Sequence, residues 1–567
     1  MRAFILNFLL SLFLTGIVSF GVFSLFDQPL TGIDDANIYF VYARNLAGGH
    51  GFVYNVGGER VEGFTSLLWT LICALAFRVS AAPELVLFLI NIMLLSFGIA
   101  AALTYLQRVF VAREANLQTR IFYSALFLIL LLSSPRYIVW NTITLMENGL
   151  WSTLLLLTTL FAIKDHGASR TMNLGFIPLS VLLILTRPES NLWVVIFLGV
   201  LFLRLAATNN AVDALRQLAP SILSFIFTLS LLTLFRIAYF GYPVPNTFYA
   251  KVAPSFGYNI QQGLAYLSKY IVSDPIVLLT VIAIVISGVN TLLHILSNRI
   301  PKEGIAYLPI IAGTGLLAPL ITGGDHFGSF RLYQNIYPIQ LLCLLYFIDR
   351  HLPSFLDTTG HPNVSQAKQR LLQSVAILML VLVVFVFQFS MWKSITSEIA
   401  IEFNVAEYGR KNGAFIQALF SPLQKLPSLG VVTSGGIKYA YEGDVVDLMG
   451  LNNTIMAHNR GDRRGIKNHA AFDIPTFYQL QPDIVWPVTV VQKEWQYSNV
   501  ETRQSWENRE GLKGLFDEPR FLELYTYARV TGKTNSNYAL VAWLKKDLLK
   551  ELAANPNFDV EEYVYIP

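Results

Sequence analysis

The sequence has few charged residues and few cysteines, and both scarcities restrict its class. Charged residues make up 14% of the 567 residues, while hydrophobic residues make up 54%; a typical soluble domain carries roughly 25% charged residues. The mean hydropathy is +0.50, so the apolar surface is too large for one water-soluble core. Cys73 and Cys343 lie in apolar stretches and provide neither a disulfide framework nor a metal-binding spacing.

The sequence also lacks the signatures of nucleotide and nucleic-acid proteins. Its formal charge is only +4, without the clustered basic residues of a nucleic-acid interface. It has no Walker loop, dinucleotide fingerprint, HExxH motif or nucleophile elbow. The segment GVVTSGGIKY (430–439) offers only a lone glycine pair. Cytoplasmic nucleotide chemistry is therefore not expected, and the energy for any reaction should come from an activated, lipid-linked substrate.

The sequence does have many long apolar runs, and a membrane-spanning helix needs about 20 such residues. Several runs are shorter, so breaks or tilts are expected. The first run is read as a retained span because it is longer than a signal-peptide core and no small-residue cleavage site follows it. The run 64–77 is read as an interfacial or re-entrant helix, with an ordinary span as the alternative. The eleven predicted spans are residues 4–26, 84–106, 121–138, 148–163, 173–186, 190–206, 219–240, 275–296, 305–322, 335–348 and 371–391.

The distribution of lysine and arginine predicts the orientation. With the N-terminus in the cytoplasm, every predicted cytoplasmic loop carries Lys or Arg, as the positive-inside rule requires. The loops rich in Asp, Glu, His, Asn and Gly then all fall outside, where a site would be built. Those outer loops are residues 27–83, 139–147, 187–189, 241–274 and 323–334.

The C-terminal part differs in pattern from the rest. Residues 1–391 are predicted to form an α-helical polytopic bundle, and residues 392–567 an extracytoplasmic α/β domain of about 150 residues. Short β-like runs alternate with Gly, Pro and Asn, and helical stretches are expected near 398–420 and 543–554. The β-like runs are GVVTS, PDIVWPVTV, YTYARVT and YALVAWL.

Two adjacent aspartates in the first outer loop are the main catalytic candidates. Asp34 and Asp35 follow the first span closely. Adjacent carboxylates repel each other, which raises the pKa of one of them and suits it to act as a general base. Alternatively, Asp34 caps the following helix, and both roles are compatible. His50 and Glu62 lie further along this glycine-rich loop.

Three other outer segments supply candidate binding residues. At TRPE (186–189), Arg187 would hold a phosphate or form an ion pair with Glu189. The remaining candidates are Asn246, Tyr249 and Lys251 in PVPNTFYAKV (243–252), and Asp325, His326 and Arg331 in GGDHFGSFRLY (323–333). Asp325 and His326 together are weak support for a metal site, so no metal is assigned; a divalent cation is left open.

Several of these segments resemble one family. The run DDANIYFVYARNLAGGHGFVYNVGGERVEGFTSLLW (34–69) is similar to the first outer loop of the AftB-like, terminal arabinofuranosyltransferase-like branch of the GT-C glycosyltransferases. The later segments MENGLW, TRPES, PNTFYAK, GGDHFGSFR and DVVDLMGLNN resemble motifs of the same branch in the same order. The resemblance covers roughly residues 30–455 and implies a GT-C-like bundle.

The resemblance also implies an activity. It predicts an inverting glycosyltransferase in a bacterial inner membrane, with a polyprenyl-phosphate sugar as donor and arabinofuranose as the first guess for the sugar. An acidic residue of the first outer loop acts as base in such enzymes, and this role falls on Asp34 or Asp35. Arg187, Arg331 and Lys251 would stabilise the departing phosphate.

Other functions and substrates stay open. The same fold could use another donor, such as mannose or amino-arabinose, or the chain could transport lipid-linked sugars without enzymatic activity. The chain shows no repeated halves of the kind common in transporters. The acceptor is a glycan or a protein.

Overall fold

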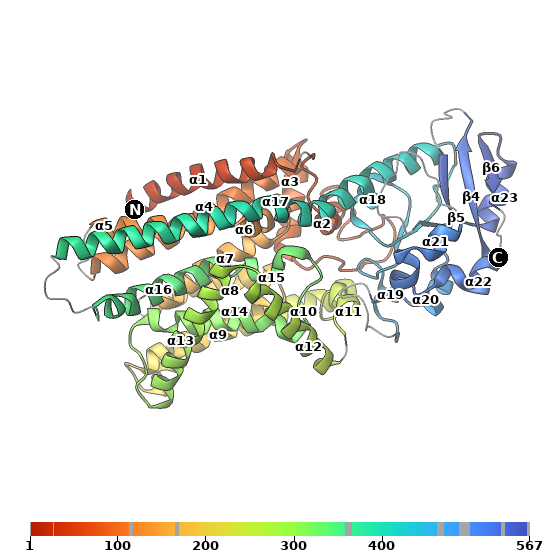
Figure 1. Ribbon diagram of the computed structural model, residues 1–567. Helices are drawn as coiled ribbons and strands as arrows, with labels where there is room; N and C mark the ends of the chain where they lie inside the picture. Colours follow the sequence, from red (N-terminus) through yellow and green to blue (C-terminus); the bar gives the residue numbers. More distant parts are fainter. Residues whose placement is uncertain are drawn as a thin grey trace. The chain divides into compact units, whose positions relative to one another are not determined.

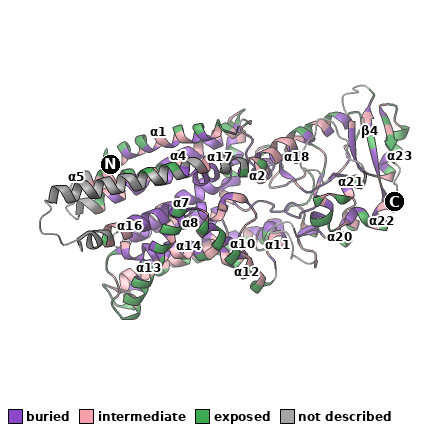
Figure 2. Cartoon of the chain, viewed as in Figure 1, coloured by how far each residue is buried: buried purple, intermediate pink, exposed green. Residues whose placement is uncertain are grey.

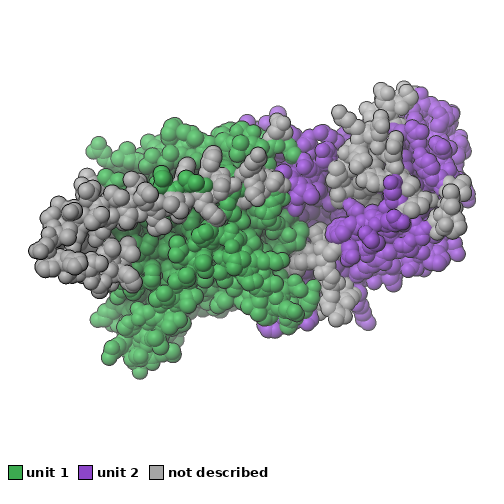
Figure 3. Space-filling model, viewed as in Figure 1, with its two compact units in different colours: residues 1–28, 88–232, 257–399 green, residues 29–87, 233–256, 400–567 purple. Residues whose placement is uncertain are grey.

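The computed structural model shows two compact units. Unit 1 comprises Met1–Gln28, Phe88–Leu232 and Gly257–Ile399; unit 2 comprises Pro29–Leu87, Thr233–Phe256 and Ala400–Pro567 (Figure 3). The residues described are 2–26, 28–112, 117–164, 169–253, 255–357, 366–461, 470–486, 499–533 and 539–563. The segment predicted to be the first outer loop thus lies in the same unit as the C-terminal region. The predicted domain boundary at residues 391 and 392 stays a prediction.

Unit 1 is built from helices, and every predicted span coincides with helix (Figure 1). Within it α7 packs on α8, and α13 packs on α14 and α16. Three helices, α4, α10 and α17, also run into unit 2. The helices are α1 (Arg2–Phe23), α4 (Pro83–Ala112), α5 (Leu117–Leu132), α6 (Pro135–Ile138), η1 (Val139–Ile143), α7 (Asn148–Ile163), α8 (Ser169–Thr186), α9 (Ser190–Ala206), α10 (Ala211–Phe240), α12 (Phe256–Val272), α13 (Pro275–Leu296), η2 (Gly304–Tyr307), α14 (Leu308–Thr322), η3 (Gly328–Phe330), α15 (Arg331–Gln334), α16 (Tyr337–Asp357) and α17 (Gln366–Phe420).

The first helix has the side-chain distribution of a membrane span. Its buried side comprises Asn7, Ser11, Thr15 and Ser19, spaced four residues apart, while large apolar side chains such as Phe13 are exposed. Small polar residues suit helix–helix contacts in a bilayer, and apolar side chains suit contact with lipid. Exposed residues run along α1 and α13 in the same way (Figure 2). The chain is therefore a multi-pass membrane protein.

The described residues contain five helices that are long and apolar enough to cross a bilayer, or six if one bent pair forms a single span. That pair, Thr119–Leu132 and Pro135–Ile143, is bent by 71°. Pro135 stands at the start of the second piece, where its fixed φ and missing N–H favour a new helix. The break agrees with the expectation of interrupted spans. The total of eleven spans stays a prediction, since α7 and α9 have only 16 and 17 residues.

Unit 2 combines the first outer loop with a mixed six-stranded sheet of order β2-β1-β3-β5-β4-β6. β1 is parallel to β2 and β3, whereas β5 is antiparallel to β3 and β4, and β6 to β4. The strands are β1 (Leu429–Val431), β2 (Val445–Asp447), β3 (Ile484–Trp486), β4 (Tyr525–Gly532), β5 (Ala539–Lys545) and β6 (Phe558–Glu562). The α/β prediction and its four strands are confirmed; β2 and β6 were not predicted, and residues 487–490 of one predicted run lie outside the described residues.

The helices of unit 2 are short apart from the segments it shares with α4, α10 and α17. The 13-residue helix α3 coincides with the predicted short helix, and the hydroxyl of Ser66 caps it by accepting from the N–H of Trp69. Its place at a membrane surface stays a prediction. The others are α2 (Asp34–Ala47), α11 (Asn246–Lys251), α18 (Gly435–Ala440), α19 (Thr454–Ala457), α20 (Ile474–Leu480), α21 (Asn499–Gln504), η4 (Glu507–Gly511), η5 (Leu515–Asp517), α22 (Pro519–Leu524) and α23 (Lys546–Ala554); α3 is Leu67–Val79.

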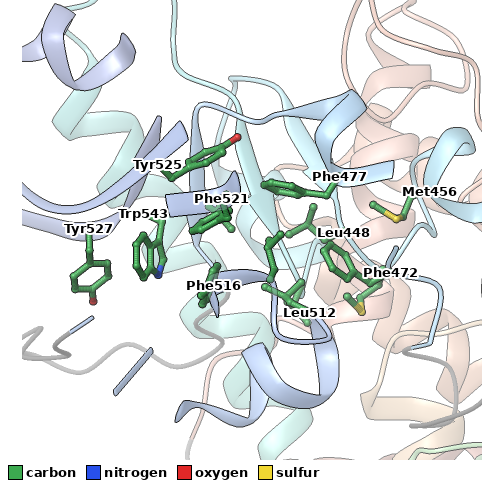
Figure 4. Close-up of a cluster of buried hydrophobic side chains, with 14 of the residues drawn as sticks. Leu448, Met456, Phe472, Phe477, Leu512, Phe516, Phe521, Tyr525, Tyr527 and Trp543 are labelled. Carbon is green, nitrogen blue, oxygen red and sulfur yellow. The ribbon is translucent and has the colours of Figure 1, made fainter. Parts of the chain in front are cut away.

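An aromatic core holds the C-terminal part of unit 2 together (Figure 4). Phe521 stacks on Tyr525 with ring centroids 4.6 Å apart, and Phe516 stacks on Trp543 at 5.2 Å. Each large aromatic side chain removes 150–250 Å² from water. The core includes Val432, which follows β1 and lies two residues before Ser434, the N-cap residue of α18.

Candidate functional site

Asp34 and Asp35 open helix α2, but neither caps it. The N-cap position is Ile33, so Asp34 is the first helical residue and the predicted capping role is wrong. The start of the helix is held instead by Asn37, whose amide donates to the carbonyls of Thr31 and Ile33 at 3.1 and 2.8 Å. Successive helical residues point about 100° apart, so the two carboxylates face different surroundings.

The carboxylate of Asp34 is clamped by the C-terminal region. The backbone N–H of Gly435 donates to Oδ2 at 3.0 Å, and that of Gly436 donates to Oδ1 at 2.7 Å. Burial raises the pKa of Asp34 from 3.8 to about 6, against the opposing effect of these two hydrogen bonds; the charge of Asp35 raises it further. A Cβ on Gly435 would lie 1.9 Å from the carbonyl oxygen of Asp34, so only glycine permits this approach.

A buried aspartate holds the clamping loop in place. Asp447 accepts from the hydroxyl of Ser434 at 3.1 Å and from the backbone and side-chain N–H groups of Asn452 at 3.0 and 2.9 Å. The hydroxyl of Tyr54 donates to the carbonyl of Ser434 at 2.6 Å. Ser434 therefore has fixed partners on both its side chain and its backbone, and the glycine pair that follows is fixed with it.

Asp35 meets the predicted cation Lys251. The ammonium group lies 3.3 Å from Oδ2 of Asp35, and both side chains remain 19% exposed. Lys251 ends α11, whose first residue is Asn246. The N–H of Asn246 donates to the carbonyl of Glu62 at 3.0 Å, and its side-chain amide donates to the carbonyls of Gly450 and Leu451. These hydrogen bonds of Asn246 fix the start of α11, and Lys251 at its end is positioned with it.

Glu62 has a structural partner that the sequence did not reveal. Its two carboxylate oxygens accept three hydrogen bonds from Arg236, at 2.9 to 3.1 Å, and both side chains are buried. Burial raises the pKa of Glu62 from 4.5 to about 7, although Arg236 lowers it. Because both oxygens of Glu62 are bonded to Arg236, this carboxylate stabilises the loop that contains Glu62 and is not available to bind a substrate.

The other two candidates of unit 2 are more accessible. His50 is exposed just beyond α2, in the turn where its N–H donates to the carbonyl of Asn45. Tyr249 is half-buried and its ring centroid lies 4.0 Å from that of His458, which also stacks on Tyr242 at 4.0 Å. Sequence reasoning missed Tyr242 and His458, since nothing local marks them as partners of Tyr249.

In unit 1, Arg187 lies between two glutamates. It donates to Glu147 and, at 2.8 Å, to Glu189. The predicted ion pair with Glu189 is confirmed, and Glu147 is a second partner. The guanidinium also lies 4.8 Å from the ring of Trp151. These partners hold Arg187 in one orientation inside the helical unit.

The GGDHFGSFRLY segment forms a second group in unit 1. Nε of Arg331 donates to Asp325 at 2.7 Å, and Nδ1 of His326 lies 3.3 Å from the same carboxylate. Ser329 and Phe330 adopt left-handed φ values of 58° and 56° just before Arg331, a strained backbone typical of functional sites. Asp325 and His326 would supply two metal ligands, and the described residues contain no group of three or more His, Cys, Asp or Glu suited to a metal ion.

The candidate residues therefore fall into two sets. Unit 2 brings together Asp34, Asp35 and Lys251, with Glu62 and Asn246 as supports, and unit 1 holds the groups around Arg187 and Arg331. Gly435, Gly436 and Asp447 complete the first set. The sequence contained a signal for these three residues, because Gly435 and Gly436 lie in GVVTSGGIKY and Asp447 lies in DVVDLMGLNN.

Comparisons with known proteins give a partial likeness of fold. No family model and no curated protein matches the chain. Among solved structures, the chain is similar to ArnT from Cupriavidus metallidurans, a crystal structure bound to undecaprenyl phosphate. The TM-score is 0.47 at 13% sequence identity, over 77% of this chain and 85% of that one.

Proposed function

We propose that the protein is an inverting glycosyltransferase that moves a sugar from a polyprenyl phosphate to a glycan or protein acceptor. Arabinofuranose is the first choice of sugar, with mannose and amino-arabinose as alternatives, and the outer face of a bacterial inner membrane is the proposed location. The motif resemblance over roughly residues 30–455 supports this reading. The observation that carries it is the pair of adjacent carboxylates, one clamped by backbone N–H groups and one facing Lys251.

The contacts of the two aspartates support a different role for each. Asp35 is proposed as the general base because its side chain is part-exposed beside a cation. Asp34 is proposed as a positioning residue, since both of its oxygens accept hydrogen bonds from Gly435 and Gly436. The sequence alone left this choice open.

The proposed reaction exchanges one bond for another at the sugar. The acceptor hydroxyl oxygen forms a bond to the anomeric carbon as the bond from that carbon to the phosphate oxygen breaks on the opposite face. The hydroxyl proton passes to the carboxylate of Asp35. The leaving group is polyprenyl phosphate, which keeps the bonding electron pair and gains one negative charge. No oxidant, reductant or nucleotide is required.

A cation is needed where that charge develops. Lys251 is one proposed group: its ammonium contacts Asp35 in the structure, and its long side chain would turn to the phosphate on the opposite face of the sugar when the donor binds. Arg187 and Arg331 remain proposed phosphate ligands, although carboxylates already engage both guanidinium groups. Glu189 and Asp325 are then proposed to orient these two arginines, and His326 to orient Asp325. The exposed His50 and the half-buried Tyr249 are proposed to contact sugar hydroxyls.

A comparison of two isosteric variants tests the proposal. The full-length protein in detergent is assayed for transfer from a synthetic polyprenyl-phosphate arabinofuranose to an arabinan oligosaccharide, with product detected by mass spectrometry. Asp35→Asn is expected to lower the rate by about 100-fold or more, the usual contribution of a general base, while donor binding persists. Asp34→Asn removes one of two acceptors and should have a smaller effect.

Asp213→Asn is the matched control, because the Asp213 side chain is 46% exposed and lies beside Arg216 and Asn210. Its rate should equal that of the unmodified protein. Full activity of Asp35→Asn would exclude Asp35 as the base. Absence of transfer by the unmodified protein with arabinofuranosyl, mannosyl and amino-arabinosyl donors would reject the transferase and leave the transporter alternative.

A further inference from the structure

The segment that leads into α7 is strained and irregular. The bent helix pair ends in the π-helix η1, an element that is rare and often found at functional sites. Two residues later the buried Leu145 has a left-handed φ of 57°. A non-glycine residue held in this region costs of order 1–3 kcal/mol. Something in its surroundings must stabilise this backbone path.

Four polar side chains around this segment are buried and incompletely bonded. Oδ1 of Asn91, Oδ1 of Asn141, Oε2 of Glu147, and both Oδ1 and Nδ2 of Asn148 have no hydrogen-bond partner among the residues that the structure describes. All four side chains are at most 1% exposed. Such atoms are rare in native proteins and normally signal an ordered water or ion. We call these four residues the asparagine cluster.

Gly149 marks where the unpartnered oxygen of Asn91 and the backbone of Asn141 approach the start of α7, directly after Asn148. A Cβ placed on Gly149 would lie 2.7 Å from Oδ1 of Asn91 and 2.4 Å from the carbonyl oxygen of Asn141. The side chain of Asn91 also donates to the carbonyl of Thr142 at 3.5 Å. Helix α4, the π-helix and the start of α7 therefore meet at one point within unit 1.

We propose that ordered water occupies the asparagine cluster. The cluster has four unpartnered acceptors and one unpartnered N–H group. Two water molecules supply four O–H donors, and their oxygens accept from Nδ2 of Asn148. The same molecules then satisfy Oε2 of Glu147, whose other oxygen accepts from Arg187. Bound water thereby solvates a charged pair inside an apolar helical unit, where polar groups must find partners within the protein.

The chemistry of the cluster favours water over a cation or a sugar. Glu147 is the only carboxylate among these four residues, and it already accepts from Arg187, which also binds Glu189; the rest of the cluster offers a cation only neutral amide oxygens. The N–H group of Asn148 would also repel a cation, whereas it suits a water oxygen. A sugar is too large for four side chains that are this completely buried. The inference does not depend on the proposed function.

Radiolytic hydroxyl-radical labelling of the full-length protein in detergent tests for this water, because radicals formed from bound water modify adjacent side chains even when they are buried. Trp140 and Met146 are the reporters, since both are buried next to cluster residues in the chain. Trp193 is the control; it is equally buried in unit 1 and packs on Phe197. Labelling of Trp140 and Met146 is expected to exceed that of Trp193 several-fold.

The variant Asn148→Leu removes two of the unpartnered atoms and should reduce labelling at both reporters. Asn173→Leu is the matched control, because the Asn173 amide already donates to the carbonyl of Gln217 at 2.8 Å; it should leave the labelling unchanged. Reporter labelling no higher than that of Trp193 in the unmodified protein would overturn the proposal. So would an unfolding temperature that depends on replacing sodium by choline and loses this dependence in Asn148→Leu, since that result identifies a cation.

Discussion

Oδ1 of Asp34 accepts a hydrogen bond from the backbone N–H of Gly436 at 2.7 Å, although the two residues are 402 positions apart in the sequence. The adjacent N–H of Gly435 binds the other oxygen. Backbone donors favour the ionised carboxylate, while burial disfavours it. The charge state of Asp34 at the start of α2 therefore depends on the first backbone N–H groups of α18 in the C-terminal region.

The close approach at Gly435 predicts a large effect from the smallest possible substitution. Gly435→Ala would place a Cβ 1.9 Å from the carbonyl oxygen of Asp34, so the loop must move and the carboxylate loses its donors. Transfer activity should fall at least tenfold, with the loss mainly in kcat because Asp34 positions the base. Steady-state kinetics with the lipid donor measures this.

Gly511→Ala is the control for the alanine substitution. No heavy atom lies within 4 Å of a Cβ built on Gly511 in the part of the chain that the structure describes, and its φ is not left-handed. This variant should keep its activity and unfolding temperature. Equal kinetics for Gly435→Ala and Gly511→Ala would show that the clamp on Asp34 does not matter for the reaction.

Removal of the cation beside the proposed base should also be costly. Lys251→Met retains a long, unbranched apolar stem but leaves Asp35 without the ammonium group at 3.3 Å. We expect a 10²–10³-fold lower rate, comparable to the loss of one charge-stabilising donor. Lys251→Arg should recover part of this activity, and the comparison separates charge from packing. If Lys251→Met and Lys251→Arg are equally active, Lys251 plays no electrostatic part.

The raised pKa of Asp34 predicts a pH-dependent stability. Burial raises the pKa from 3.8 to about 6, so between these values the folded protein binds more protons than the unfolded one. The stabilising contribution of this group is therefore complete below about pH 3.8 and is lost as the pH rises through about 6. Thermal unfolding in detergent should show a gain between about pH 7.5 and about pH 5.5 that is smaller in Asp34→Asn.

Activity should change in the opposite direction over the same pH range. Protonated Asp34 offers one fewer good acceptor to the two glycine N–H groups, so transfer should decline below about pH 6 as the clamp weakens. Two results together would show that Asp34 does not titrate in this pH range. The transfer rate would be independent of pH, and the change in unfolding temperature with pH would be the same in the unmodified protein and in Asp34→Asn.

Local patterns were sufficient to predict much of this architecture. Each long apolar run forms a helix, because a helix in an apolar environment satisfies all backbone hydrogen bonds within its own segment. The β-branched and aromatic runs in the C-terminal region form strands. The candidates Asp34, Asp35 and Lys251 are brought together in unit 2. Their segments were recognisable because glycine and polar residues stood out from an apolar background.

Long-range pairing was not predictable in the same way. Arg236 lies in the apolar helix α10, and nothing near it in sequence indicates that it binds Glu62, 174 positions earlier. The glycine pair at 435–436 was too common a pattern to be recognised as the ligand of Asp34. The strand β6 was missed because it carries three acidic side chains among five residues, a composition that β-propensity disfavours. The strand β2 is as short as the predicted β1 and β3, so its length does not explain why it was missed.

The buried pair of Glu62 and Arg236 provides the last prediction, which concerns stability. Arg236→Met removes the partner of a buried carboxylate, and such a loss costs about 3–5 kcal/mol. The double variant Glu62→Met/Arg236→Met should be closer to the unmodified protein, because it leaves no charge buried. Arg216→Met is the control, since Arg216 pairs with Asp213 at the surface, where a pair contributes about 0–1 kcal/mol. Unfolding temperatures in detergent rank the three variants. A double variant less stable than Arg236→Met would mean that the Glu62 side chain stabilises the fold independently of its ion pair with Arg236.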